Sequence, residues 1–186
     1  MQSVAQRIER GGSPLQSQVT AAQVCWYAAY TCANHEKRVA AELEARGVEH
    51  FLPLYSSMRR WKDRRVRLEL PLFPGYVFVR TDLCDRLRVV QIPSLVRLVG
   101  FSGQPTALPD AEMEIMRSGF SRSLLAEPHP FLTAGRRVQI VGGPFAGLEG
   151  VLKRKQSNLR VVVSLDLIQR SVAVDVDAAD VRGVVE

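Results

Sequence analysis

The stretch Pro71-Leu72-Phe73-Pro74-Gly75-Tyr76-Val77-Phe78-Val79 decides how this chain is interpreted. Its Pro-Gly step allows a tight bend, and aromatic side chains flank that bend on both sides. Alternation beyond the bend sends Tyr76 and Phe78 to one face of a strand and the two valines to the other. Two interpretations fit the rings: an apolar surface shared with Tyr30 of a neighbouring strand, or a filled core, which we favour for Phe78.

The residues on either side of this stretch predict an α+β domain at 24–120, preceded by a flexible tail at 1–23. The expected elements are a strand at 24–30, a helix that is capped by Asn34 and followed by Gly47, strands at 48–54 and 72–79, a helix at 82–90, a strand at 96–101 and a helix that begins at Pro109 and is capped near Gly119. This order predicts helices packed on a mostly antiparallel sheet.

Beyond residue 120 the pattern of the sequence changes to short apolar runs separated by turn residues. Residues 121–130 contain two prolines and no clear period, which predicts a linker. Short valine-rich runs at 137–141, 150–154, 159–165 and 171–176 are separated by turn residues and predict a small all-β barrel at 131–186. Within it, residues 138–151 predict a hairpin whose Gly-Gly-Pro turn is followed by Phe145.

The densest charge lies at 58–67, where six basic residues stand against one acidic residue. Because the segment lies between two strand patterns, we expect it to project as a hairpin. Two interpretations remain open: a site that neutralises phosphates while an indole stacks on a base, or a solvated tip whose charges prevent edge-to-edge pairing. The candidate nucleic-acid contacts are Arg59, Arg60, Trp61, Lys62, Arg64 and Arg65.

The composition favours a binding protein over an enzyme. A net charge of +6 suggests an acidic partner. No phosphate-binding glycine loop, nucleophile motif or ligand cluster is present, so neither a catalytic residue, a metal nor a cofactor is expected. The three cysteines, Cys25, Cys32 and Cys84, form no CxxC pair. We therefore expect them to be free thiols in a reducing cytosol. The sequence shows neither a secretory signal nor an apolar run long enough to span a membrane, so we expect a cytoplasmic protein.

Taken together, the stretches WYAAY (26–30), NHEKRVAAELEARG (34–47), FLPLY (51–55) and LFPGYVFV (72–79) resemble the N-terminal NGN domain of the NusG/RfaH family of transcription elongation factors. VQIVGGPFAGLEGVL (138–152) resembles the C-terminal KOW motif of that family, which forms an SH3-like barrel. The resemblance covers about residues 24–184. LFPGY followed at this distance by a KOW hairpin is a specific combination, whereas a KOW motif alone also occurs in ribosomal proteins.

The resemblance implies a non-enzymatic factor that binds the clamp helices of the largest RNA polymerase subunit and suppresses pausing or termination. The implied polymerase contacts are Tyr30, Phe73, Pro74 and Tyr76, with Phe78 and Phe101 as supports. It also implies that the basic hairpin approaches upstream or non-template DNA. The KOW domain is implied to bind Rho or the small-subunit ribosomal protein NusE, through loops that map to Phe145, Leu167 and Ile168.

Three departures suggest a specialised paralogue of this family. The loop Ser164-Leu165-Asp166-Leu167-Ile168-Gln169-Arg170 differs in length and charge from that of housekeeping NusG, residues 83–90 lack a histidine-threonine tract, and the tail at 1–23 has no counterpart. We therefore hypothesise an operon-directed antiterminator. Housekeeping NusG, which supports Rho termination and couples transcription to translation, a ribosome- or RNA-binding KOW protein and an unrecognised enzyme are the alternatives.

Overall fold

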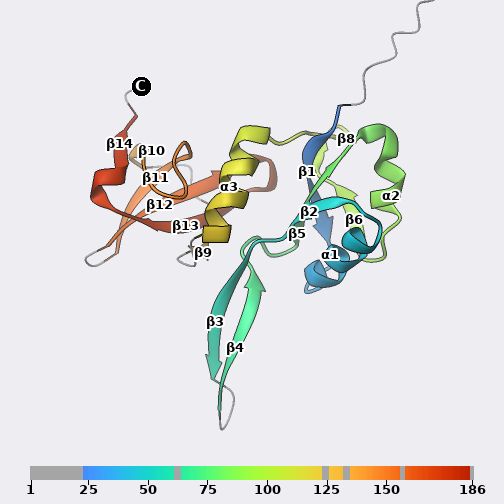
Figure 1. Ribbon diagram of the computed structural model, residues 1–186, viewed down its shortest axis with the longest axis horizontal. Coiled ribbons are helices and arrows are strands. Elements are labelled where there is room, and N and C mark those ends of the chain that lie inside the picture. Colours follow the sequence, from blue (N-terminus) through green and yellow to red (C-terminus); the bar gives the residue numbers. More distant parts are fainter. Residues whose placement is uncertain (1–22, 61–63, 123–125, 132–134, 156–157, 185–186) are drawn as a thin grey trace, which may run out of the picture.

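The computed structural model describes residues 23–60, 64–122, 126–131, 135–155 and 158–184. An N-terminal α+β domain and a C-terminal β domain lie on opposite sides of helix α3 (Figure 1). The fold class expected from the sequence is thus confirmed. The tail through residue 22, Trp61 and Lys62 lie outside the described residues.

The N-terminal domain is built on an antiparallel four-stranded sheet in the order β2-β5-β1-β6. One face of the sheet, with Tyr27 and Val77, packs on α1 and α2, while the other, with Trp26 and Phe78, faces α3 and the C-terminal domain. The elements are β1 (Cys25–Thr31), α1 (Glu36–Ala45), β2 (Glu49–Phe51), β3 (Leu54–Arg60), β4 (Arg65–Pro71), β5 (Tyr76–Thr81), η1 (Leu83–Asp85), α2 (Arg86–Val90), β6 (Leu95–Leu98), β7 (Gly100–Phe101), β8 (Gln104–Pro105) and α3 (Asp110–Arg122).

Helix α1 ends before Gly47, as the sequence predicts, and begins one residue later than predicted. Gly47 follows the helix with φ +65°, the left-handed conformation that a glycine after a helix adopts readily. The prediction that Asn34 caps the helix is wrong, because Asn34 lies in the preceding turn with φ +62° and the N-cap residue is His35. Val39 and Leu43 are buried against the sheet at helical spacing, as expected.

The C-terminal domain is an antiparallel six-stranded sheet in the order β14-β10-β11-β12-β13-β9. Four of its strands match the expected valine-rich runs, and β9 and β14 were not expected. Strand β9 lies within the segment predicted to be a linker and pairs with β13, where its Pro128 is compatible with an edge strand. The elements are β9 (Ala126–His129), β10 (Arg137–Ile140), β11 (Glu149–Lys155), β12 (Asn158–Leu165), η2 (Asp166–Ile168), β13 (Arg170–Val176), η3 (Ala178–Asp180) and β14 (Val181–Gly183).

Helix α3 joins the two domains through a close contact at Gly119. The helix continues to Arg122, so the predicted end near Gly119 is wrong. A Cβ on Gly119 would lie 2.4 Å from the ring of Phe145, which shows that only glycine allows this approach. Phe145 also packs edge-on against Phe120 of α3, with ring centroids 5.1 Å apart. Consequently, buried residues of both domains form one continuous hydrophobic cluster.

Candidate functional site

The Pro-Gly step forms a tight turn between β4 and β5. The backbone N–H of Tyr76 donates to the carbonyl of Phe73 at 3.0 Å, and Gly75 has φ +87°. Proline and glycine at the two central positions suit a type II turn, which requires a positive φ at the second of them. The turn leaves Pro74 exposed at its tip.

Two neighbouring elements hold this turn through the backbone of Gly75. Its carbonyl accepts from the N–H of Thr31 at 2.8 Å, and its own N–H donates to Glu36 Oε1 at 2.7 Å. Glu36 opens helix α1, and only 4% of it is exposed. Sequence analysis did not identify Glu36, because its acceptor role depends on a contact with a residue 39 positions away. Its burial shows that it contributes to the interior and not to the surface charge.

Tyr30 and Tyr76 lie side by side beside this turn, and together with Pro74 we call them the aromatic surface. They are register partners on β1 and β5, and their ring centroids are 5.4 Å apart. The guanidinium carbon of Arg97 lies 6.0 Å from the Tyr30 centroid, and that of Arg170 lies 5.9 Å from the Tyr76 centroid. Since Arg170 belongs to β13, the C-terminal domain contacts the aromatic surface directly.

The other aromatic residues proposed for this surface divide differently from the expectation. Phe73 and Phe78 are fully buried and pack edge-to-face, with ring centroids 5.3 Å apart. Phe101, in contrast, is 68% exposed. It lies in a short hairpin whose strands, β7 and β8, have two residues each. Phe73 is therefore covered in this arrangement and Phe101 is accessible, whereas Phe78 lies in the core, the interpretation that the sequence favours.

The basic segment forms a two-stranded hairpin, β3–β4, that projects from the body of the protein (Figure 1). We call this hairpin the basic arm. It confirms the projecting geometry expected from the sequence. Arg59, Arg60, Arg64 and Arg65 are all exposed on it. The arm therefore presents four of the six candidate nucleic-acid contacts to solvent, and the other two, Trp61 and Lys62, are not described.

The residues proposed for the C-terminal partner site are covered in this arrangement. Phe145 and Ile168 are buried and Leu167 is half-buried, and all three belong to or pack against the cluster shared by both domains. Phe145 and Ile168 are therefore not accessible to a partner in this arrangement. Close packing against α3 is the physical reason for Phe145.

Carboxylates of the two domains lie near one another beside α3. Burial raises the pKa of Glu112 on α3, and repulsion from Asp166 and Glu149 of the C-terminal domain raises that pKa further. Ionised Glu112 thus opposes this domain arrangement. Nothing local in the sequence marks this group, because Glu112 is an ordinary acidic residue in the first turn of a helix.

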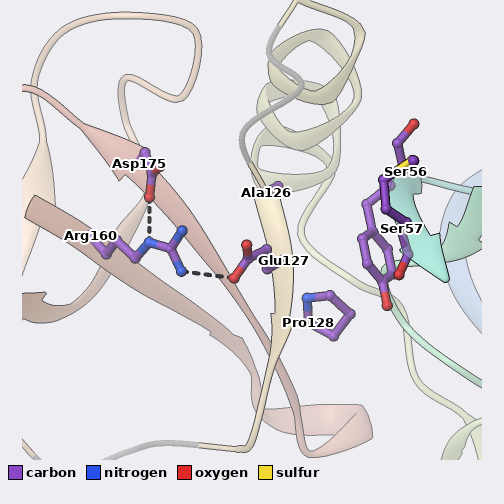
Figure 2. Close-up of a pocket in the computed structure, with 9 residues that line it drawn as sticks. Ser56, Ser57, Ala126, Glu127, Pro128, Arg160 and Asp175 are labelled. Carbon is purple, nitrogen blue, oxygen red and sulfur yellow. Dashed lines mark hydrogen bonds and ion pairs between the residues drawn. The ribbon is translucent and has the colours of Figure 1, made fainter. Parts of the chain in front are cut away.

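A cavity of about 560 Å³ lies between the base of the basic arm and strand β9 (Figure 2). Arg160 lies in its wall, paired with Glu127 at 2.9 Å and with Asp175. The hydrogen bond to Glu127 and the interaction with Asp175 raise the pKa of Arg160. The charged groups of the wall are therefore paired with one another.

The described residues contain no group of three or more His, Cys, Asp or Glu side chains placed to hold a metal ion. No helix in the same part of the chain is both long and apolar enough to cross a membrane.

Comparisons with known proteins agree on one family. Residues 24–117 match the family model described as NusG, transcription termination factor nusG. The transcription termination/antitermination protein NusG of Helicobacter pylori is 26% identical over 140 residues, which cover 69% of this chain and 80% of that protein. The protein of the same name from Pseudomonas aeruginosa is 24% identical over 174 residues, which cover 86% of this chain and 98% of that protein. A solved structure titled "Domain interaction in Thermotoga maritima NusG" superposes with a TM-score of 0.57 at 25% identity, covering 86% and 97%.

Proposed function

Since this chain belongs to the NusG family of transcription termination/antitermination factors, we propose that it binds RNA polymerase through the aromatic surface and alters pausing or termination. The clamp helices of the largest polymerase subunit are the proposed docking site. The observation that carries the proposal is the pair of neighbouring tyrosines, Tyr30 and Tyr76, beside an exposed proline on a turn whose backbone is hydrogen-bonded from two sides.

The geometry of the aromatic surface supports a protein partner. Tyr30 is 38% exposed although it lies on a central strand of the sheet. Tyrosine rings provide a large apolar contact and a polar rim, and they lose little conformational entropy on binding. Phe101, the most exposed large aromatic residue of the described chain, adds a further candidate contact.

The basic arm supports a second contact, with upstream or non-template DNA. Exposed arginines on a projecting hairpin can reach a phosphate backbone while the body of the domain rests on polymerase. The candidates that the sequence selects for this contact are Arg59, Arg60, Arg64 and Arg65, with Trp61 and Lys62 between them.

The C-terminal domain is proposed to recruit a further partner, either Rho or the ribosomal protein NusE, through Phe145, Leu167 and Ile168. In the present arrangement these side chains pack in the cluster that the two domains share. Binding through them therefore requires the C-terminal domain to separate from α3.

The test of the polymerase proposal uses Tyr30→Ala combined with Tyr76→Ala. We expect the affinity for core RNA polymerase to fall by about 10-fold or more, because each large aromatic side chain at an interface centre contributes on the order of 1–2 kcal/mol. Tyr55→Ala, a half-buried tyrosine at the base of the arm, serves as the matched control. Unchanged polymerase affinity in the folded double variant would falsify the proposed surface.

Transcription in vitro, with and without Rho, separates the functional alternatives. An operon-directed antiterminator lengthens transcripts in both conditions, whereas a housekeeping factor increases Rho-dependent release. A ribosome-binding KOW protein changes neither and cosediments with ribosomes in the absence of polymerase.

A further inference from the structure

We propose that the basic arm binds phosphates with one face only, formed by Arg60, Arg65 and Arg67, and that Arg59 on the opposite face is not part of this contact. This inference rests on the proposed nucleic-acid contact of the arm. It adds Arg67, which sequence analysis did not select, and removes Arg59 from the contact.

The pairing register of the arm assigns the side chains to faces. Arg60 of β3 pairs directly with Arg65 of β4. Arg67 lies two residues after Arg65 on β4 and pairs with Met58 of β3. Directly paired residues and residues two apart share a face of a β-ribbon, so the three arginines lie together. Arg59 pairs with Val66 and therefore lies on the other face.

The exposure of strand β4 agrees with this assignment. Arg65, Arg67 and Glu69 are exposed, while the residues between them, Val66 and Leu68, are half-buried. The ribbon is thus amphipathic: one face is charged and exposed, and the other carries a stripe of aliphatic side chains. Arg59 stands at the end of the aliphatic stripe.

In the part of the chain that the structure describes, the arginines of this face form no ion pair with a carboxylate. Elsewhere, Arg80, Arg117 and Arg160 each form an ion pair with a carboxylate. Among the described residues, no carboxylate lies within ion-pair distance of Arg60, Arg65 or Arg67. Arg67 donates instead from Nε to the Ser56 hydroxyl at 3.0 Å, a bond between two residues of the same face.

The direct pairing of Arg60 with Arg65 is unfavourable for the isolated protein. Like charges directly opposite one another on a β-ribbon destabilise it, by an amount comparable to the stabilisation from an opposite-charge pair. A polyanion on this face would remove the repulsion. Arg65 and Arg67 are two residues apart, about 6.8 Å along the strand, which is about twice the axial spacing of phosphates on one nucleic-acid strand. The face therefore fits a phosphate backbone.

The experiment compares single alanine variants of the full chain, Arg59→Ala, Arg65→Ala and Arg67→Ala, together with the triple variant of Arg60, Arg65 and Arg67. Fluorescence anisotropy measures binding to a short DNA duplex and to the corresponding single strand at several salt concentrations. Loss of one phosphate contact lowers the slope of log K against log salt by about 0.9 for a duplex and about 0.7 for a single strand.

We expect Arg65→Ala and Arg67→Ala each to lose about one contact, the triple variant about three, and Arg59→Ala none. The affinities for the two probes at the same salt concentration show whether the arm prefers duplex or single-stranded DNA. A slope loss for Arg59→Ala equal to that for Arg65→Ala would overturn the face assignment and leave the nucleic-acid contact standing. Unchanged slopes in all four variants, each checked for folding by circular dichroism, would overturn the contact itself. The polymerase proposal is tested separately, by the affinity of the Tyr30→Ala and Tyr76→Ala double variant for core RNA polymerase.

Discussion

The aromatic surface and the basic arm are neighbours in the chain, yet they differ in how far they are exposed to solvent. Strand β4 of the arm ends at Pro71, just before the turn that carries Pro74 and Tyr76. The arm extends into solvent, whereas Tyr76 is half-buried and lies beside Arg170 of the C-terminal domain. Charged side chains are well solvated, while exposed aromatic rings favour burial. The difference indicates that the proposed nucleic-acid contact is accessible in this arrangement and that the proposed polymerase contact is partly covered.

The largest effect is expected for Phe73→Ala, which separates support from contact within the aromatic region. Phe73 is 1% exposed, so we expect the free energy of unfolding to fall by about 3–5 kcal/mol in chemical denaturation. Phe101→Ala is the control, with an expected change within about 0.5 kcal/mol because its ring is exposed. Equal losses for the two variants would contradict the division between support and contact.

The burial of Phe73 and the exposure of Phe101 also show how far the sequence can be interpreted. Alternation and turn residues are local signals, and they were sufficient for the turn at Gly75, for the four central strands of the C-terminal domain and for the projecting arm. The aromatic character of both phenylalanines was visible, but their burial depends on which distant element covers them. Phe73 belongs to the hydrophobic cluster that residues of both domains form, while nothing described covers Phe101 to the same extent.

The contacts between the domains were missed for the same reason. Gly119 was interpreted as a helix end because glycine often follows a helix. Its actual role is to admit the ring of Phe145, a residue 26 positions later that belongs to the other domain, and nothing local in the sequence marks that approach. Strand β9 was interpreted as linker because of its prolines, although Pro128 is tolerated at the sheet edge where it pairs with β13.

Glu36→Ala tests whether the hydrogen bond from Gly75 to the Glu36 carboxylate stabilises the turn beside the aromatic surface. Removing the acceptor leaves the N–H of Gly75 unsatisfied, which costs about 1–3 kcal/mol. We expect a lower melting temperature and a weaker affinity for polymerase, with nucleic-acid binding by the arm unchanged. The control Glu36→Gln retains a carbonyl acceptor and should recover most of the polymerase affinity. The amide resonance of Gly75 should move in both variants, and equal losses of affinity in both would contradict the role of the acceptor.

Arg170→Ala tests whether the C-terminal domain covers the aromatic surface through the contact between Arg170 and Tyr76. Its guanidinium contacts the ring of Tyr76 from the C-terminal domain, an interaction that contributes about 0.5–1 kcal/mol at exposed sites. If this contact helps to hold the domains together, its loss should raise the affinity for polymerase by about 2- to 5-fold. Arg97→Ala removes the corresponding contact with Tyr30 from within the N-terminal domain. We expect no gain in affinity from that control, and a gain in both variants would show that the effect is not caused by the C-terminal domain.

The smallest effect is expected for the dependence of domain packing on pH, which Glu112 governs. Burial, with repulsion from Asp166 and Glu149, raises the pKa of Glu112 in the folded protein above its value in the unfolded chain. Between these two pKa values the folded protein binds more protons, so stability should increase as pH falls through this window. The destabilisation is fully present above the raised pKa and absent below the ordinary glutamate pKa of about 4.3.

Glu112→Gln removes the charge and should therefore stabilise the protein at neutral pH, with a gain that disappears as the pH falls to about 4.3. Melting temperatures of the variant and of the original chain across this range measure the difference. Glu114→Gln is the matched control on the same helix, because Glu114 is paired with Arg117 and its charge does not oppose the fold. A gain for Glu112→Gln that is independent of pH would show that the side chain acts through packing, and the electrostatic opposition between α3 and the C-terminal domain would then be rejected.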